Sequence, residues 1–177
     1  FDNEKNKNLI FSSYPSYPNK KKFTNYKKKD DKLFFKEEVI RAPVFLRNVS
    51  NISIILNYLS FFFVSIFYGL YVLIKKQFEV IFVFCPSPII NIVPIIIINK
   101  LFKKKVVIWV LDLWPNTIVD LKILKNKFII RIFQKIMNYI YDNSDLILAQ
   151  SEPIKNEIQK ITKTKCIYFP SWPESNI

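Results

Sequence analysis

Asp112, Trp114 and Pro115 are the residues of this chain whose types and spacing could best support chemistry. They follow an apolar run at 106–111, of a kind that predicts a strand buried on both faces. In open α/β sheets, ligands bind at the carboxyl ends of the strands, which is where Asp112 would lie. Because a carboxylate is rarely buried without a partner, Asp112 is expected to face a cleft or to bond a loop. In the structural alternative, Asp112 caps the next helix and Trp114 packs against the sheet.

Ser87 and Ser151 follow two further predicted strands, at 79–85 and 145–150. Each serine would stand at the start of a helix, where free backbone N–H groups attract phosphate or sugar oxygens. For Ser151, simple capping of the helix is the alternative.

The composition excludes several kinds of site. The 177 residues include no histidine and a single glycine, Gly69. A Ser-His-Asp or Cys-His nucleophile and a histidine-based metal site are therefore impossible within this chain. No glycine-rich phosphate loop can be built either. Cys85 and Cys166 both lie in apolar runs and are expected as core thiols rather than as a disulfide.

Positive charge dominates, with 27 Lys and Arg against 14 Asp and Glu and a formal net charge of +13. Lysine clusters at 20–22, 27–29 and 103–105 suit nucleic acid, an anionic membrane surface or phosphorylated substrates. A solvated lysine run is the simpler interpretation of each cluster. No nucleic-acid-binding motif accompanies the lysines, so no nucleic acid is expected as a partner.

Residues 49–74 carry no charge, and the segment is long enough to span a bilayer. Ser50, Ser53, Asn57 and Ser60 recur at steps of three and four residues, so they would form a polar stripe on one face of a helix. A helix packed on a sheet or lying at a membrane interface fits this pattern better than a transmembrane span, which remains the alternative.

Predicted strands and helices alternate along the chain. The strands are expected at 9–12, 39–45, 79–85, 106–111, 145–150 and 165–169, and the helices at 49–74, 89–102, 121–141 and 151–161. Four isoleucines at 95–98 could also be interpreted as a strand. This alternation predicts an α/β fold with a doubly wound parallel sheet. Apart from polar residues at their ends, the runs at 79–85, 106–111, 145–150 and 165–169 are continuously apolar, so helices are expected on both faces of the sheet.

Several short motifs occur in a characteristic order and spacing. They are Tyr14–Pro18 with Tyr26 and Lys27, Val39–Val44, Asn57–Phe61, Cys85–Pro88, Asp112–Thr117, Ser144–Ser151 and Phe169–Glu174. Together they resemble the N-terminal domain of family 4 glycosyltransferases, in the branch that builds bacterial capsule, O-antigen and slime polysaccharides. The sequence Asp-Leu-Trp-Pro-Asn-Thr from Asp112 is close to the Asp-Leu-Trp-Pro-Glu-Ser signature of that family. Asn116 replaces the usual glutamate, and Leu111 stands where many members have histidine or arginine.

The resemblance implies the Rossmann-like N-terminal half of a GT-B fold, truncated at both ends. Residues 1–170 would form the acceptor-side domain without its first strand, and 171–177 would begin a linker to an absent C-terminal donor domain. The whole enzyme would transfer a hexose-type sugar, with retention, from a nucleotide-sugar to a lipid-linked polyprenyl pyrophosphate acceptor in lipopolysaccharide or capsule synthesis. The donor would bind mainly to the absent domain, without a metal or other cofactor, so the fragment alone would be inactive.

The resemblance also assigns roles to individual residues. Asp112 would be catalytic. Substrate would contact Ser87, Trp114, Asn116 and Ser151. The interdomain hinge would contain Pro170, Trp172 and Glu174.

The expected location is cytoplasmic and peripheral, on the inner face of the plasma membrane, through the 49–74 helix and nearby lysines. The alternative function is that of a non-catalytic basic protein that uses residues 49–74 as a membrane anchor.

Overall fold

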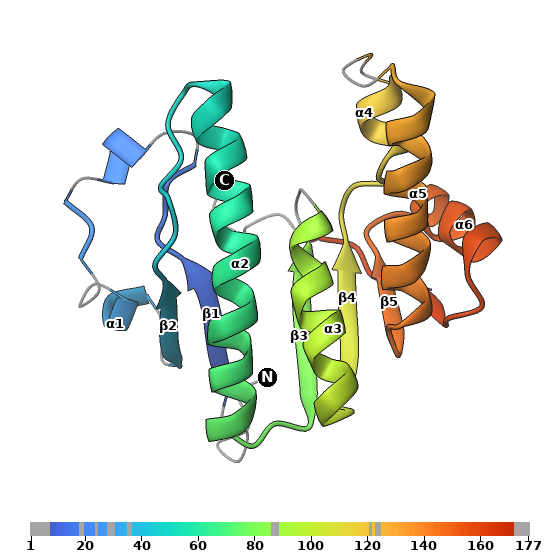
Figure 1. Cartoon of the computed structure of the whole chain (residues 1–177). Helices are drawn as coiled ribbons and strands as arrows, with labels where there is room; N and C mark the ends of the chain where they lie inside the picture. Colours follow the sequence, from blue (N-terminus) through green and yellow to red (C-terminus); the bar gives the residue numbers. More distant parts are fainter. Residues whose placement is uncertain are drawn as a thin grey trace. The chain divides into compact units, whose positions relative to one another are not determined.

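The computed structural model describes residues 8–17, 20–23, 25–27, 31–34, 37–85, 89–120, 122 and 125–171. The chain forms two compact units, Phe1–Tyr71 and Val72–Ile177. Each unit contains a parallel β-sheet together with helices, so the predicted α/β class with parallel strands is confirmed (Figure 1).

The first unit contains a two-stranded parallel sheet. Its elements are β1 (Leu9–Ser13), η1 (Lys20–Phe23), α1 (Asp31–Phe34), β2 (Glu38–Ala42) and most of α2 (Asn51–Lys75). The two strands pair in register from Leu9↔Glu38 to Ser13↔Ala42. The second strand ends earlier than predicted, immediately before Pro43, because proline has no N–H to give to a sheet.

Helix α2 uses the predicted polar stripe to hold the chain that precedes it. Asn57 donates to the carbonyl of Phe45 at 2.6 Å, and the Ser60 hydroxyl accepts the N–H of Phe45 at 2.9 Å. Ser53 accepts the N–H of Asn48 at 3.0 Å. The polar stripe therefore forms hydrogen bonds with backbone N–H and C=O groups of an irregular segment at 45–48. By length and composition alone, α2 could cross a membrane.

The second unit contains a four-stranded parallel sheet in the order β3-β4-β5-β6. Its strands are β3 (Val80–Cys85), β4 (Lys105–Val110), β5 (Leu146–Ala149) and β6 (Cys166–Tyr168), and its helices are η3 (Ile89–Ile92), α3 (Val93–Phe102), α4 (Asn116–Asp120), α5 (Lys127–Asp142) and α6 (Glu152–Ile161). The prediction that these four runs pair in parallel within one sheet is confirmed.

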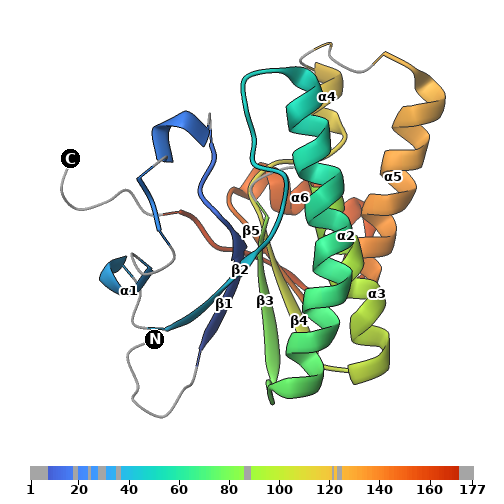
Figure 2. The ribbon, with the colours of Figure 1, turned by 60° about the vertical axis from the view of Figure 1, so that its left-hand side comes forward.

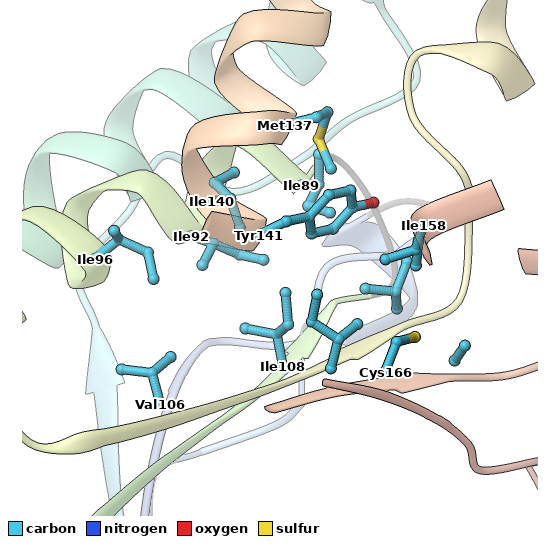
Figure 3. Close-up of a cluster of buried hydrophobic side chains, with 13 residues drawn as sticks. Ile89, Ile92, Ile96, Val106, Ile108, Met137, Ile140, Tyr141, Ile158 and Cys166 are labelled. Atoms are coloured by element: carbon cyan, nitrogen blue, oxygen red, sulfur yellow. The ribbon is translucent and has the colours of Figure 1, made fainter. Parts of the chain in front are cut away.

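The core of this unit lies on one face of the sheet. It is formed by Ile89, Ile92, Ile96, Val106, Ile108, Val110, Met137, Ile140, Tyr141, Ile147, Ala149, Ile158 and Cys166 (Figure 3). Alternate residues of β4 and β5 contribute to it, β6 adds Cys166, the partly buried Ile81 and Val83 of β3 pack against it, and α3, α5 and α6 supply the remaining helical residues together with η3. The buried thiol of Cys166 is part of this core, as predicted, and burial raises its pKa.

The opposite face of the sheet was also expected to carry helices, but α3, α5 and α6 do not cover it. Figure 2 shows α3 and α5 together on one side of β3 and β4. With strands in sequential order, crossovers of one hand place every connecting helix on the same face. Val80, Phe82 and Phe84, which point to the other face, are each about half exposed.

Local signals set the ends of the helices. The helix predicted from residue 121 begins instead at Lys127, because the Asn126 side chain caps it and Lys122 has a left-handed backbone with φ of 57°. The strand alternative for 95–98 is wrong, since Pro94 occupies the first turn of α3 and Lys103 ends the helix. Ser151 caps α6, accepting the N–H of Ile154 at 3.4 Å.

Candidate functional site at the carboxyl edge of the sheet

The carboxyl ends of the four strands in the second unit form one edge. In register, Cys85, Val110, Ala149 and Tyr168 stand side by side across the sheet. The pairing continues past the strands, because Gln150 donates to the carbonyl of Val110 at 3.1 Å and Phe169 donates to that of Ala149 at 2.8 Å. The edge thus brings together the chain segments that follow β4, β5 and β6.

Asp112 lies on this edge, two residues after β4, as the sequence predicted. Its side chain is half-buried and has no hydrogen bond or ion pair within the described part of the chain. It does not cap α4, because the first turn of that helix is closed by Thr117, which donates its N–H and hydroxyl to the carbonyl of Leu113. The structural alternative therefore fails for Asp112, and its carboxylate is available to a ligand.

The Trp114 side chain packs against helix α5. Its ring lies against Phe133 of α5, with ring centroids 5.8 Å apart, and it packs on the hydrophobic core. The peptide bond between Trp114 and Pro115 is cis. A substrate contact by Trp114 would therefore use only the part of the ring that packing leaves exposed.

Trp114 and Asn116 line one cavity of about 430 Å³, and Asp112 does not. Gln134 and Asn138 of α5 and Lys160 of α6 supply its other polar groups. Amides and an ammonium group suit hydroxyl or anionic oxygens, and an indole suits the apolar face of a ring. Asn116 was predicted as a site residue, whereas Gln134, Asn138 and Lys160 were missed, because in the sequence they are merely polar positions of two amphipathic helices.

Ser151 lies on the same edge as Asp112, at the start of α6. Its hydroxyl oxygen is used as a helix cap, as the alternative for this residue proposed. Beside it, Gln150 donates to the Ser171 hydroxyl at 3.0 Å and ties the end of β5 to the chain after β6. Gln150 and Ser171 were missed as site residues, although Gln150 ends a predicted strand and could have been noted for that reason.

Pro170 is half-buried at the same edge, next to the Gln150–Ser171 bond. Three further predicted site residues, Ser87, Trp172 and Glu174, lie outside the described residues.

A row of aromatic rings supports this edge from the face opposite the core. Trp109 lies edge-on to both Phe84 and Phe169, with ring centroids 5.3 and 5.4 Å apart. Its indole N–H donates to the carbonyl of Phe169 at 3.1 Å. This contact fixes the segment after β6 against β4, close to where Asp112 leaves the sheet.

The opposite edge of the sheet carries a structural carboxylate. Asp145 accepts the N–H of Val106 at 2.8 Å and the ammonium of Lys105 at 3.0 Å. The bond from the Val106 backbone, with a smaller contribution from Lys105, lowers the pKa of Asp145 against the opposing effect of burial. Within the residues that the structure describes, no group of three or more His, Cys, Asp or Glu side chains could hold a metal ion.

A second cavity, of about 280 Å³, lies in the first unit. It is lined by Tyr14, Pro15, Lys20, Lys21, Phe23, Tyr26 and Leu46. Tyr14 and Tyr26 come from the two parts of one sequence motif, so the fold brings both parts to the same wall. Burial, and donation of its hydroxyl proton to Asp31, raise the pKa of Tyr26.

No protein-family model, curated protein or solved structure matches this chain. The assignment of function therefore depends on the site and on the resemblance of the motifs.

Proposed function

We propose that this chain is the acceptor-side, N-terminal half of a membrane-associated retaining glycosyltransferase with a GT-B fold. The observation that carries the proposal is Asp112 at the carboxyl edge of a parallel sheet, followed by Leu113, Trp114 and Pro115; its carboxylate has no hydrogen bond or ion pair among the described residues. Ligands of open α/β proteins bind at this edge. The motif that resembles the family signature thus coincides with the position where the fold favours a ligand.

In this proposal Asp112 accepts the proton from the acceptor hydroxyl as the sugar is transferred. A carboxylate can act as a general base when it lies within hydrogen-bond reach of the reacting hydroxyl and has no competing cation. Asn116, Ser151 and the exposed part of Trp114 would position the acceptor. Ser87 would join them from the segment after β3, and Pro170, Trp172 and Glu174 would form the hinge.

The acceptor in the proposal is a polyprenyl pyrophosphate lipid that carries the growing saccharide. The net charge of +13 favours such an anionic lipid. The donor is a nucleotide-sugar, bound mainly by a C-terminal domain outside this chain, and transfer needs no metal. A doubly wound sheet belongs to the same proposal, since the uncovered face with Phe82 and Phe84 would then be covered in the whole protein.

Sugar transfer by the whole protein tests this proposal. Membranes with the full-length protein are incubated with a panel of labelled nucleotide-sugars, and the lipid extract is analysed for labelled saccharide. The proposal expects label in a pyrophosphate-linked lipid, with the anomeric configuration of the donor kept. No transfer from any nucleotide-sugar to lipid would contradict it.

A non-catalytic basic membrane-anchored protein is the second candidate, favoured by the length and apolar composition of α2. The two candidates differ in two observables. The anchor requires α2 to cross the bilayer and predicts no transfer in the same assay.

A further inference from the structure

One side of α2 presents a continuous apolar stripe to solvent. Most of its members lie three, four or seven residues apart, which places them on one helical face, and they are Ile52, Ile55, Leu56, Leu59, Phe63, Phe67 and Ile74. Phe67 is 70% exposed and Ile52 is 72% exposed. An exposed apolar surface of this length marks an interaction site.

Another side of the same helix is already occupied. Phe11 of β1 packs against Phe61 and Tyr68, with ring centroids 6.1 and 6.3 Å apart. The polar residues Ser53, Asn57 and Ser60 bind the backbone of the 45–48 segment. One side of the helix therefore packs against a strand and an irregular segment, while its apolar stripe remains exposed.

We propose that α2 lies in the plane of an anionic lipid bilayer, with this stripe inserted below the headgroups, and does not cross the membrane. A crossing helix would carry β1 and the 45–48 segment into the hydrocarbon, where irregular backbone exposed to lipid is not tolerated. An in-plane helix leaves both on the aqueous side. Its geometry is that of an interfacial helix, with one apolar face and one polar face.

The distribution of charge favours an anionic bilayer, rather than a second copy of the chain, as the partner of the apolar stripe. No charged residue interrupts the stripe, and the exposed Lys75 and Lys76 follow its end. Lysines at this position attract anionic headgroups. Two copies, each with a net charge of +13, would repel one another.

Binding of the full chain to preformed vesicles tests whether the apolar stripe of α2 inserts into the bilayer. Phe67→Gln removes an apolar side chain from the stripe without changing the charge, and Phe128→Gln is the matched control, because Phe128 is 71% exposed but lies on α5. We expect Phe67→Gln to weaken binding to vesicles with anionic lipid about tenfold. The control should bind like the unaltered protein. Equal binding by the two variants, or equal binding to neutral and anionic vesicles, would overturn the proposal, as would a dimer that only Phe67→Gln dissociates.

The depth of spin labels in the bilayer distinguishes an in-plane α2 helix from one that crosses the membrane. Labels are attached to cysteines at 52, 63 and 74, after Cys85 and Cys166 are replaced by Ala. The in-plane helix predicts equal, shallow depths at the three positions. A label at 63 near the bilayer centre, with those at 52 and 74 close to opposite surfaces, would refute it. Neither experiment uses sugar transfer, so either can fail while the proposed enzyme activity stands.

Discussion

Replacing Arg41 by Met should destabilise the first unit strongly. The Arg41 guanidinium donates from Nη1 to the carbonyl of Ser13 at 2.7 Å and from Nη2 to the Tyr26 hydroxyl at 2.8 Å. It also pairs with both carboxylate oxygens of Asp31. The two charged side chains are only 8% and 7% exposed, so this ion pair is buried.

The size of the effect follows from the charge that remains. Arg41→Met takes the guanidinium away from the buried Asp31 carboxylate, and removing one partner of a buried ion pair costs about 3–5 kcal/mol. The double variant Arg41→Met, Asp31→Leu removes both charges and should recover about 2 kcal/mol or more of that loss. The recovery stays incomplete because the carbonyl of Ser13 and the hydroxyl of Tyr26 still lose a donor.

The assay must report on the first unit, since the chain forms two compact units. Urea unfolding is followed by hydrogen exchange in peptides from residues 8–71. Arg131→Met is the control, because Arg131 is exposed on α5 and should change stability by less than about 0.5 kcal/mol. Two results would refute the reasoning: an Arg41→Met variant as stable as the control, or a double variant as unstable as the single one.

Two further predictions concern the second unit. Ser151→Ala should lower the free energy of unfolding by about 1 kcal/mol, because α6 loses its cap, whereas Ser151→Thr should be close to wild type. Urea titrations measure both variants, and an equal loss of stability in the two would contradict capping. Asp145 has a pKa below its usual 3.8, so its contribution to stability is present above that pH and is lost as the pH falls further. Below about pH 3.8, acid should therefore lower the free energy of unfolding of the wild type more than that of Asp145→Asn. Parallel curves of unfolding free energy against pH for the two proteins would refute this.

The sequence predicted the strands of the second unit well because their cause is local. Runs such as 106–111 are apolar at every position, which indicates a strand and places its carboxyl end. The order of strands in a sheet has no local signature. Helices were therefore expected on both faces, whereas the sequential order of β3 to β6 places α3, α5 and α6 on one.

The candidate site was predicted in part, for the same physical reason. Asp112 was placed from the end of its strand alone, which needs no knowledge of packing. The position of the Trp114 ring depends on its packing against Phe133, nineteen positions further along the chain, and no pattern in the sequence pairs the two residues. The cavity that contains Lys160 arises only when α5 and α6 pack together, so it could not be foreseen.

The spacing of polar residues in α2 predicted a stripe but not its partner. Asn57 and Ser60 were assigned to one helical face, and the structure adds that this face binds the backbone of Phe45. A periodic pattern shows which side chains share a face. What covers that face depends on a segment with no pattern of its own, at 45–48.

Transfer of sugar by an Asp112→Asn variant of the full-length protein tests the central claim most directly. Asp120→Asn is the matched control, because Asp120 is exposed at the end of α4. Loss of a general base typically costs about 10²–10⁴-fold in rate, and Asp112→Asn should show such a loss with unchanged stability, since its carboxylate has no partner within the described residues. Asp120→Asn should retain normal transfer. Near-normal transfer by Asp112→Asn would contradict a catalytic role for this carboxylate.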